Sequence, residues 1–217
     1  MSDHVTPTPT PGWFPVPAIP VVVGGDGDPV MDPAAHAAYL AALDFALGLH
    51  TEFRKGGRYV PYLTHLLDVS STVLEDGGTL EAAIAGLLHD TVEDKHVAYD
   101  ELTERFGERV AAIVRGCTDS GELAPGAAKP AFLERKKSHL AGLAARAERI
   151  RSGAPAPEDV EVLAVTAADK LSNLRATLGD LDATGLGYLD VFKGGLFLTH
   201  WYYETVVAIL VAGTTPA

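Results

Sequence analysis

The sequence predicts a single all-α domain. Apolar residues recur at helical spacing through most of the chain, strand-like alternation is almost absent, and no internal repeat is visible. The chain has 217 residues, of which 47% are hydrophobic, so it is long and apolar enough to bury a core of its own. These observations favour one helical domain over residues 31–213.

Residues 1–30 are rich in Pro, Thr and Gly and show no helical period, so we expect a flexible arm or a strap laid on the domain. Within it, Val21–Val23 suits an extended piece. The first helix is expected to begin with Asp32 as its N-cap and Pro33 in its first position, and to end near Leu49.

The middle of the chain predicts four shorter helices. A Gly-rich turn precedes a second helix over Tyr62–Leu74, and Thr79 then caps a third helix that carries a cluster of His and acidic residues. Asp100 is expected to cap a helix that ends near Phe106, and another helix follows over Glu108–Cys117.

Three longer helices are expected toward the C-terminus, after a polar loop over 120–129. They are separated by Pro and Gly residues, which break helices. The expected elements are a charged helix over Ala131–Arg151, a break over Gly153–Pro157, a helix from there through Leu181, and a last helix over Leu186–Val211 interrupted near Gly194 and Gly195.

Composition excludes several classes of protein. The formal net charge of −12 argues against sequence-independent binding to the nucleic-acid backbone. Cys117 is the one cysteine, so no internal disulfide is expected, and its apolar surroundings favour a packing role over a nucleophilic one. We see no signal peptide, and no apolar run approaches the roughly 20 residues of a membrane span. A cytoplasmic protein without membrane contact is the simplest prediction.

The richest motif is His89-Asp90-Thr91-Val92-Glu93-Asp94, which closes an apolar helical stretch. Adjacent His and Asp offer a nitrogen and an oxygen ligand, a combination that suits manganese, iron or zinc. On one continuous helix, Glu93 follows His89 by four positions and Asp94 follows Asp90 by four, so all four would share a face. Gathering these polar and acidic side chains beside leucines costs free energy unless a cation balances their charge.

Two further residues complete a candidate metal site. His65 lies near the start of the second expected helix, and Asp169 lies inside an otherwise apolar helix. With His89 and Asp90 they supply two imidazoles and two carboxylates, which would fill four positions of an octahedral site and leave room for water and a substrate oxygen.

In these motifs the sequence resembles the HD-domain superfamily of metal-dependent phosphohydrolases. It is most similar to the hydrolase domain of Rel/Spo-type enzymes and to small alarmone hydrolases, over about residues 35–205. The motifs that carry the resemblance are Arg54-Lys55-Gly56 with Pro61-Tyr62 and His65, His89-Asp90 with Glu93-Asp94, Phe106-Gly107 leading to Gly116–Asp119, Glu134–Lys137, and Ala168–Leu171 with Asn173 and Arg175.

The resemblance implies an HD-domain helical bundle that holds one Mn²⁺ with the four ligands above. Glu93 and Asp94 would position or activate the attacking water. The implied contacts with the nucleotide substrate come from Arg54, Lys55, Lys136, Asn173 and Arg175. The implied reaction removes the 3′-pyrophosphate from guanosine tetra- or pentaphosphate, giving GDP or GTP and pyrophosphate.

The sequence departs from the family pattern at positions expected to contact the nucleotide. The loop between Lys55 and Pro61 is longer than usual, and Ala176 stands where the family often has threonine, with Thr177 following. No synthetase domain is recognised, so hydrolysis alone is expected. The departures leave open a related substrate: an adenosine alarmone, NADPH, or the pyrophosphorylated 3′ end of tRNA, the last as an antitoxin to a toxic synthetase.

Structural alternatives stand beside each candidate. His65 could be an ordinary helix histidine, Asp169 a partner of Lys170 or Arg175, and Glu93-Asp94 a cap of the next turn. Arg54-Lys55 could be an ordinary charged loop, and Glu134–Lys137 a solvated helix face. A binding module that keeps the metal site and works by contact is a further alternative. The apolar last helix also suits a homodimer seam.

Overall fold

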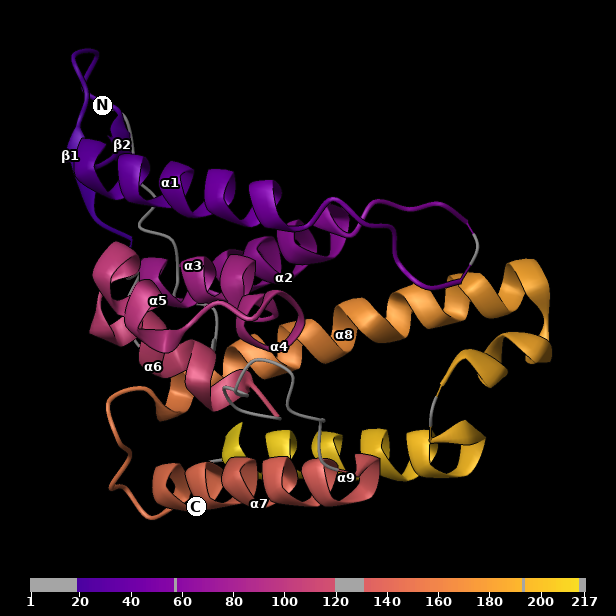
Figure 1. Ribbon diagram of the computed structural model, residues 1–217. Helices are drawn as coiled ribbons and strands as arrows, with labels where there is room; N and C mark the ends of the chain where they lie inside the picture. The colour runs from indigo at the N-terminus through magenta and orange to yellow at the C-terminus, as the bar shows by residue number, and fades with distance from the viewer. Residues whose placement is uncertain (1–18, 57, 120–130, 193, 215–217) are drawn as a thin grey trace, which may run out of the picture.

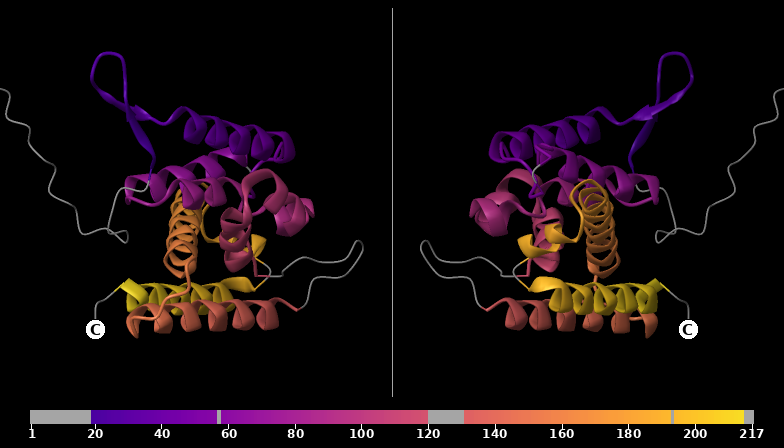
Figure 2. Two further views of the ribbon diagram at one scale, coloured as in Figure 1. Left: turned by 90° about the vertical axis from the view of Figure 1, so that its left-hand side faces the viewer. Right: turned by 90° about the vertical axis from the view of Figure 1, so that its right-hand side faces the viewer.

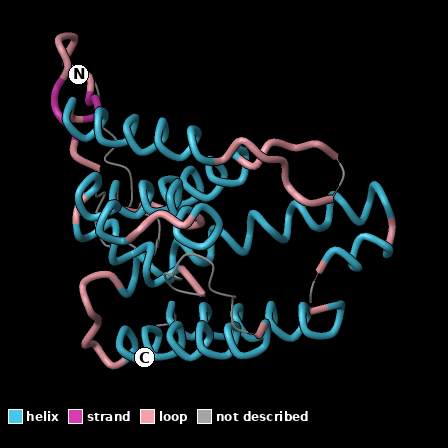
Figure 3. The backbone as a smooth tube through the Cα atoms, viewed as in Figure 1, coloured by secondary structure: helices cyan, strands magenta, loops and turns pink. Residues whose placement is uncertain are grey.

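The computed structural model describes residues 19–56, 58–119, 131–192 and 194–214. Within these ranges the chain is almost wholly helical, and its one sheet is a two-stranded hairpin (Figure 3). The predicted all-α fold is therefore confirmed. The first 18 residues of the expected arm and the expected loop at 120–129 lie outside the described residues.

The described part of the arm forms a hairpin that projects beyond the helical body (Figure 1). Strand β1 (Val21–Val23) pairs antiparallel with β2 (Pro29–Met31), with Val22 opposite Val30. Extended structure at Val21–Val23 agrees with the sequence, but its partner strand was not predicted, since Pro29–Met31 is too short to show a strand pattern.

Helices α1 (Pro33–Leu49), α2 (Leu63–Glu75) and α3 (Leu80–Leu88) follow the predicted order. Oδ1 of Asp32 accepts the amides of Ala34 and Ala35 at 2.9 and 3.1 Å, so the predicted N-cap is confirmed. Thr79 likewise caps α3, where its Oγ1 accepts the amide of Ala82 at 3.0 Å.

Helix α3 is the centre of the core. Every residue in it except Glu81 is buried, and it contacts α1, α2, α6 and α8. Gly86 allows the close approach of α2, because a Cβ at this position would lie 3.2 Å from the Cα of Ser70. The sequence therefore places the His-Asp motif at the end of the most buried helix.

The expected third helix is not continuous. It ends at Leu88, and after a two-residue turn a short helix α4 (Thr91–Lys95) begins. The prediction that His89, Asp90, Glu93 and Asp94 share the face of one helix is therefore wrong in its geometry. Local periodicity did not reveal this break, because both turn residues keep right-handed helical backbone angles.

Helices α5 (Tyr99–Phe106) and α6 (Glu108–Cys117) follow. The bounds predicted for α6 are confirmed. The predicted cap at Asp100 is wrong: the cap position is Ala98, and Asp100 lies in the first helical turn. A carboxylate in that turn still favours the helix start, because it faces the positive end of the helix dipole.

The C-terminal half contains α7 (Phe132–Arg151), α8 (Asp159–Thr184), the 3₁₀ helix η1 (Leu186–Val191) and α9 (Gly195–Thr214). The predicted interruption near Gly195 is present, where φ is +59°. Helix α8 crosses the molecule between the α1–α6 group and the side-by-side pair α7 and α9 (Figures 1 and 2). This central helix carries Asp169.

Helix α9 corrects one expectation. Among the described residues, Gly195–Gly213 is long and apolar enough to cross a membrane by length and composition, although this alone is weak evidence. His200 and Glu204 interrupt the apolar run in the sequence, so the helix does not show as an unbroken apolar stretch. In the structure α9 packs along α7 and also contacts α8.

Candidate active site

Four polar side chains from α2, the turn after α3 and α8 meet in one cluster. His65 of α2, His89 and Asp90 of the turn after α3 each offer one ligand atom, and these three atoms lie within 4.8 Å of one another. Oδ1 of Asp169 lies 3.4 Å from Nε2 of His65 and 3.8 Å from Nε2 of His89. The structure thus brings together all four residues that the sequence singled out as metal ligands.

The turn between α3 and α4 presents two of these groups together. His89 has backbone angles of −59° and −28°, and Asp90 has −96° and −3°. The carbonyl of Asp90 accepts the amide of Asp94 at 2.9 Å, which places Asp94 one helical turn beyond it. The hydroxyl of Thr91 donates to the carbonyl of Leu88 at 2.6 Å and closes the turn.

Both imidazoles are oriented by their second nitrogen. Nδ1 of His89 donates to the carbonyl of Gly86 at 2.8 Å, and Nδ1 of His65 lies 2.9 Å from Oγ of Ser172. Nε2 of His89 is buried and makes no hydrogen bond within the described structure. Nε2 faces two carboxylates, at 3.1 Å from Oδ2 of Asp90 and 3.8 Å from Oδ1 of Asp169. This arrangement fits a divalent metal, because metal-bound histidines are usually oriented through their other ring nitrogen.

The two carboxylates are held by hydrogen bonds of their own. Oδ2 of Asp90 accepts from the phenol of Tyr62 at 2.5 Å. Asp169 accepts from Nδ2 of Asn173 through Oδ1, and from Nζ of Lys170 at 2.5 Å through Oδ2. Each ligand therefore has a fixed direction before any ion arrives.

The charges of this cluster shift one another's pKa. Burial opposes ionisation of Asp90 and Asp169, but the neighbouring charges and hydrogen bonds together outweigh it, led by the charge of His89 at Asp90 and that of Lys170 at Asp169. Both carboxyl pKa values consequently lie below their usual range. Burial opposes protonation of His89, yet the Asp90 charge raises its pKa to about 9. Two carboxylates thus attract positive charge to this point.

Glu93 and Asp94, the predicted catalytic pair, lie on α4 beside the cluster. NH1 of Arg135, from α7, lies 3.4 Å from Oε1 of Glu93 and also pairs with Asp119. The negative charge of Asp94 contributes to raising the pKa of Tyr62, after burial and Asp90. The sequence offered contact with substrate phosphates for the run Glu134–Lys137 as a whole, and the pairing of Arg135 with Glu93 was not predicted.

Lys136 has a structural environment that the sequence did not show. Its Nζ donates to Oδ2 of Asp119 at 2.6 Å and lies 4.5 Å from the ring centre of Tyr202. These contacts anchor α7 to the end of α6 and to α9. Its predicted contact with substrate stays a prediction.

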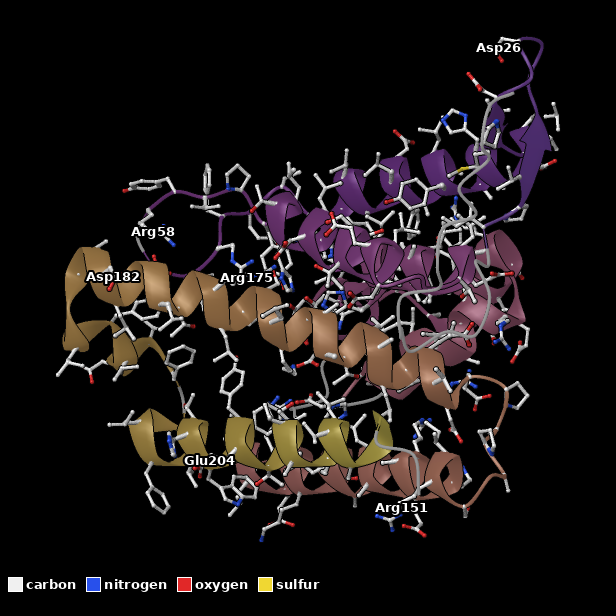
Figure 4. The ribbon with its side chains drawn as sticks, turned by 180° about the vertical axis from the view of Figure 1, so that it is seen from behind. Asp26, Arg58, Arg151, Arg175, Asp182 and Glu204 are labelled. Carbon is white, nitrogen blue, oxygen red and sulfur yellow. The ribbon has the colours of Figure 1, made fainter. Side chains whose placement is uncertain are left out.

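A cationic cavity of about 400 Å³ adjoins the cluster. Ser172 belongs to its wall, and its hydroxyl lies 2.9 Å from Nδ1 of His65, so one side chain connects the cavity wall to the candidate metal site. The predicted substrate residues Arg54, Lys55 and Arg175 line it. Figure 4 shows Arg175 on α8 with Arg58 nearby. The cavity thus gathers positive charge on a protein whose net charge is strongly negative.

Asn173 is not one of the residues that line the cavity, but it contacts one of them. Its Oδ1 accepts from NH2 of Arg54 at 2.9 Å, while its Nδ2 donates to Asp169. It therefore links a cavity arginine to a ligand carboxylate. Its predicted contact with substrate stays a prediction.

Arg58 is a cavity residue that the sequence analysis missed. It pairs with the buried carboxylate of Asp180 and donates to the carbonyl of Ala176 at 3.3 Å. Gly56 has φ of +126° and lies so close to Asp180 that a Cβ would be 2.5 Å from Oδ2. The long loop is thereby held against α8. In the sequence, the close spacing of Arg54, Lys55 and Arg58 was the signal that could have pointed to Arg58.

Comparison with known proteins agrees with this geometry. Residues 42–184 match the family model described as HD domain. A guanosine-3′,5′-bis(diphosphate) 3′-pyrophosphohydrolase of Aquifex aeolicus is 47% identical over 83 residues, which are 38% of this chain and 12% of that protein. The bifunctional (p)ppGpp synthase/hydrolase SpoT of Escherichia coli is 32% identical over 66% of this chain and 18% of its own. The chain thus spans less than a fifth of these relatives.

Two solved structures are similar in fold. One, from a study of a metazoan ortholog of SpoT that hydrolyzes ppGpp, has a TM-score of 0.57 and 25% identity, covering 80% of this chain and 85% of that one. The other, lmo0812 of Listeria monocytogenes, has a TM-score of 0.55 and 30% identity, covering 70% and 86%. The resemblance expected from the motifs is confirmed.

Proposed function

We propose, since this chain belongs to the HD-domain family, that it is a metal-dependent hydrolase that removes the 3′-pyrophosphate from guanosine tetra- or pentaphosphate. One observation carries the proposal. Two oriented imidazoles and two carboxylates converge close to a cavity whose lining includes Arg54, Lys55, Arg58 and Arg175, together with Asp68 and Asp180. A site with metal ligands on one side and several cations on the other suits a highly phosphorylated small molecule.

The metal would be held by His65, His89, Asp90 and Asp169, and we propose Mn²⁺, which accepts mixed nitrogen and oxygen ligands. When bound, such an ion makes a water more acidic and offsets phosphate charge. The hydrogen bonds from Tyr62 and Asn173 keep the two carboxylates in place.

The cavity residues bind and orient the substrate. Arg54 is held through Asn173, so its guanidinium plane is available to stack on the purine, while Lys55 and Arg175 attract the phosphates. Binding both ends of the nucleotide places the 3′-pyrophosphate at the ligand cluster. This positioning lowers the barrier because the reacting groups are already aligned.

In this proposal Glu93 accepts a proton from the attacking water, with Asp94 on the same short helix assisting. The water oxygen bonds to phosphorus, and the bond between that phosphorus and the ribose 3′-oxygen breaks. The 3′-oxygen takes up a proton, which yields GDP or GTP and pyrophosphate. Arg135 orients Glu93 through its contact with Oε1.

A related substrate is the second candidate, favoured by the long loop. Arg58 adds a positive charge to the cavity, and its ion pair with Asp180 holds the long loop against α8. The loop therefore forms part of the wall of the proposed nucleotide pocket. The same chemistry would then act on an adenosine alarmone, NADPH, or a pyrophosphorylated tRNA 3′ end, as an antitoxin in the last case.

A binding module that acts by contact alone, without catalysis, is the remaining alternative. A cytoplasmic location and the absence of membrane contact stay predictions.

The test is product analysis with purified protein, Mn²⁺ and ppGpp, with Asp90→Ala as the matched ligand variant. GDP and pyrophosphate from the wild type only are the expected products. Turnover of NADPH, adenosine alarmones or pyrophosphorylated tRNA in the same panel, without turnover of ppGpp, would move the assignment to that substrate. Metal binding without turnover of any of them would contradict the hydrolase proposal.

A further inference from the structure

The outer side of α9 is an apolar surface exposed to solvent. Phe197, Val207 and Val211 are 81%, 47% and 58% exposed. The opposite side of the helix buries Tyr202, Val206 and Leu210 in the core. From Gly195 to Thr214 the sequence contains one acidic residue and one histidine and no Lys or Arg, so this helix lacks the charged face of an ordinary surface helix.

Five of the exposed residues of α9 follow the spacing of a coiled-coil seam, and the exposed Leu196 and Ala208 flank them. Positions 197, 200, 204, 207 and 211 alternate steps of three and four, and all five are exposed. This pattern matches the a and d positions of a heptad, which pack against a second helix. We define these five residues as the α9 stripe.

Charge within the stripe favours one particular pairing. In an antiparallel pair of helices, a positions face d positions of the other helix. The register that places His200 opposite Glu204 of the partner subunit also places Phe197 opposite Val207 of the partner subunit, because both pairs are centred on Tyr202. A twofold axis repeats each contact, so one register satisfies two His–Glu pairs and two apolar pairs.

We infer that the α9 stripe is the seam of a homodimer in which two copies of α9 pack antiparallel about Tyr202. The stripe is self-complementary, as a twofold interface requires, and polar pairs at its centre select the register. Within one chain, Nδ1 of His200 already lies 3.3 Å from Oε2 of Glu204, so both side chains occupy the same face. The inference concerns assembly and is independent of the proposed reaction.

Sedimentation velocity of the full chain across a range of concentrations tests the interface. The wild type is expected at twice the chain mass of 22.8 kDa. Val207→Glu should raise the dissociation constant about tenfold or more, because it places a charge in the apolar part of the seam. Leu178→Glu is the matched control: Leu178 is 62% exposed on α8, away from the stripe, so the dimer should persist.

The register is tested by disulfide cross-linking in a Cys117→Ala background. The combined variant Phe197→Cys with Val207→Cys should form a cross-linked dimer under mild oxidation, whereas each single variant should not. Ten residues of helix, about 15 Å, separate these positions within a chain, so no internal bond competes. Efficient cross-linking of the Phe197→Cys variant alone would overturn the antiparallel register.

Charge exchange provides the second register test. His200→Glu should weaken the dimer, and adding Glu204→Lys should restore it. Thermal melts verify that each variant remains folded. A wild-type protein that is monomeric at every concentration, including one that pellets with phosphatidylcholine vesicles, would overturn the inference. So would a dimer whose dissociation constant is unaffected by Val207→Glu.

Discussion

The phenol of Tyr62 donates a hydrogen bond of 2.5 Å to Oδ2 of Asp90, one of the four candidate metal ligands. Burial and the charge of Asp90 raise the pKa of Tyr62 above its usual value, so the phenol keeps its proton and donates near neutral pH. Tyr62 also stacks on His50, at 5.1 Å between ring centres. This packing fixes the phenol, and the phenol fixes the carboxylate.

Tyr62→Phe should therefore weaken Mn²⁺ binding about tenfold to a hundredfold, because the carboxylate loses the group that orients it. Isothermal titration calorimetry with Mn²⁺ measures the change. Tyr59→Phe is the matched control, since Tyr59 is 77% exposed and contacts Phe53 only through ring edges. Equal affinities for wild type and Tyr62→Phe would show that Asp90 does not need this bond.

Arg135 is expected to act on the reaction through Glu93. Arg135→Gln should lower kcat about tenfold to a hundredfold with little change in KM, because Glu93 loses its orientation while the cavity stays intact. Steady-state kinetics on the substrate identified in the product analysis measures both constants. Partial rescue by Arg135→Lys would separate this effect from a loss of folding.

Lys137→Ala is the control for Arg135. Lys137 lies two positions along the same helix, is 56% exposed, and pairs only with Glu134 at 3.6 Å among the described residues. Its removal should leave kcat unchanged. A change in KM alone in Arg135→Gln would instead place Arg135 in direct contact with substrate.

His139 predicts a loss of stability in acid. It is buried on α7, and burial together with the charges of Lys170 and Lys136 lowers its pKa from 6.5 to about 4. The unfolded chain therefore binds a proton at a pH where the folded chain does not. This contribution to stability is present above pH 6.5 and is lost as the pH falls toward 4, by at most about 1.4 kcal/mol per pH unit.

Urea unfolding in metal-free buffer between pH 7 and about pH 4 measures this loss. His139→Leu should flatten the dependence of the free energy of unfolding on pH in that window, because it removes the titrating group. His36→Leu, at an exposed position of α1, should retain the wild-type slope. An identical slope in His139→Leu would assign the acid sensitivity to other groups.

The sequence predicted those features of the fold and of the candidate site that depend on residues close together in the chain. The caps at Asp32 and Thr79 and the bounds of α6 follow from residues that are neighbours in the chain. The four ligands were recognised because each belongs to a short motif of the family. Their convergence within a few ångströms is a property of the helix packing, which no single motif contains.

Pairings between distant residues were not predictable in the same way. Arg58 and Asp180 are 122 positions apart, and Arg135 and Glu93 are 42 positions apart. Neither pair leaves a local signal, because an arginine in a loop or on a helix face is common in any soluble protein. The break at His89 was equally hidden, since its backbone angles remain nearly helical.

Arg58 is the residue through which the long loop should affect substrate binding. Arg58→Ala should raise KM about tenfold and leave kcat nearly unchanged, because it removes a cavity cation without touching the ligand cluster. It also frees the buried carboxylate of Asp180, whose side chain is 4% exposed. The double variant Arg58→Ala with Asp180→Ala separates the two effects. If KM remains high in the double variant, Arg58 contacts the substrate; recovery of wild-type KM would show that Asp180, left without a partner, repels the phosphates.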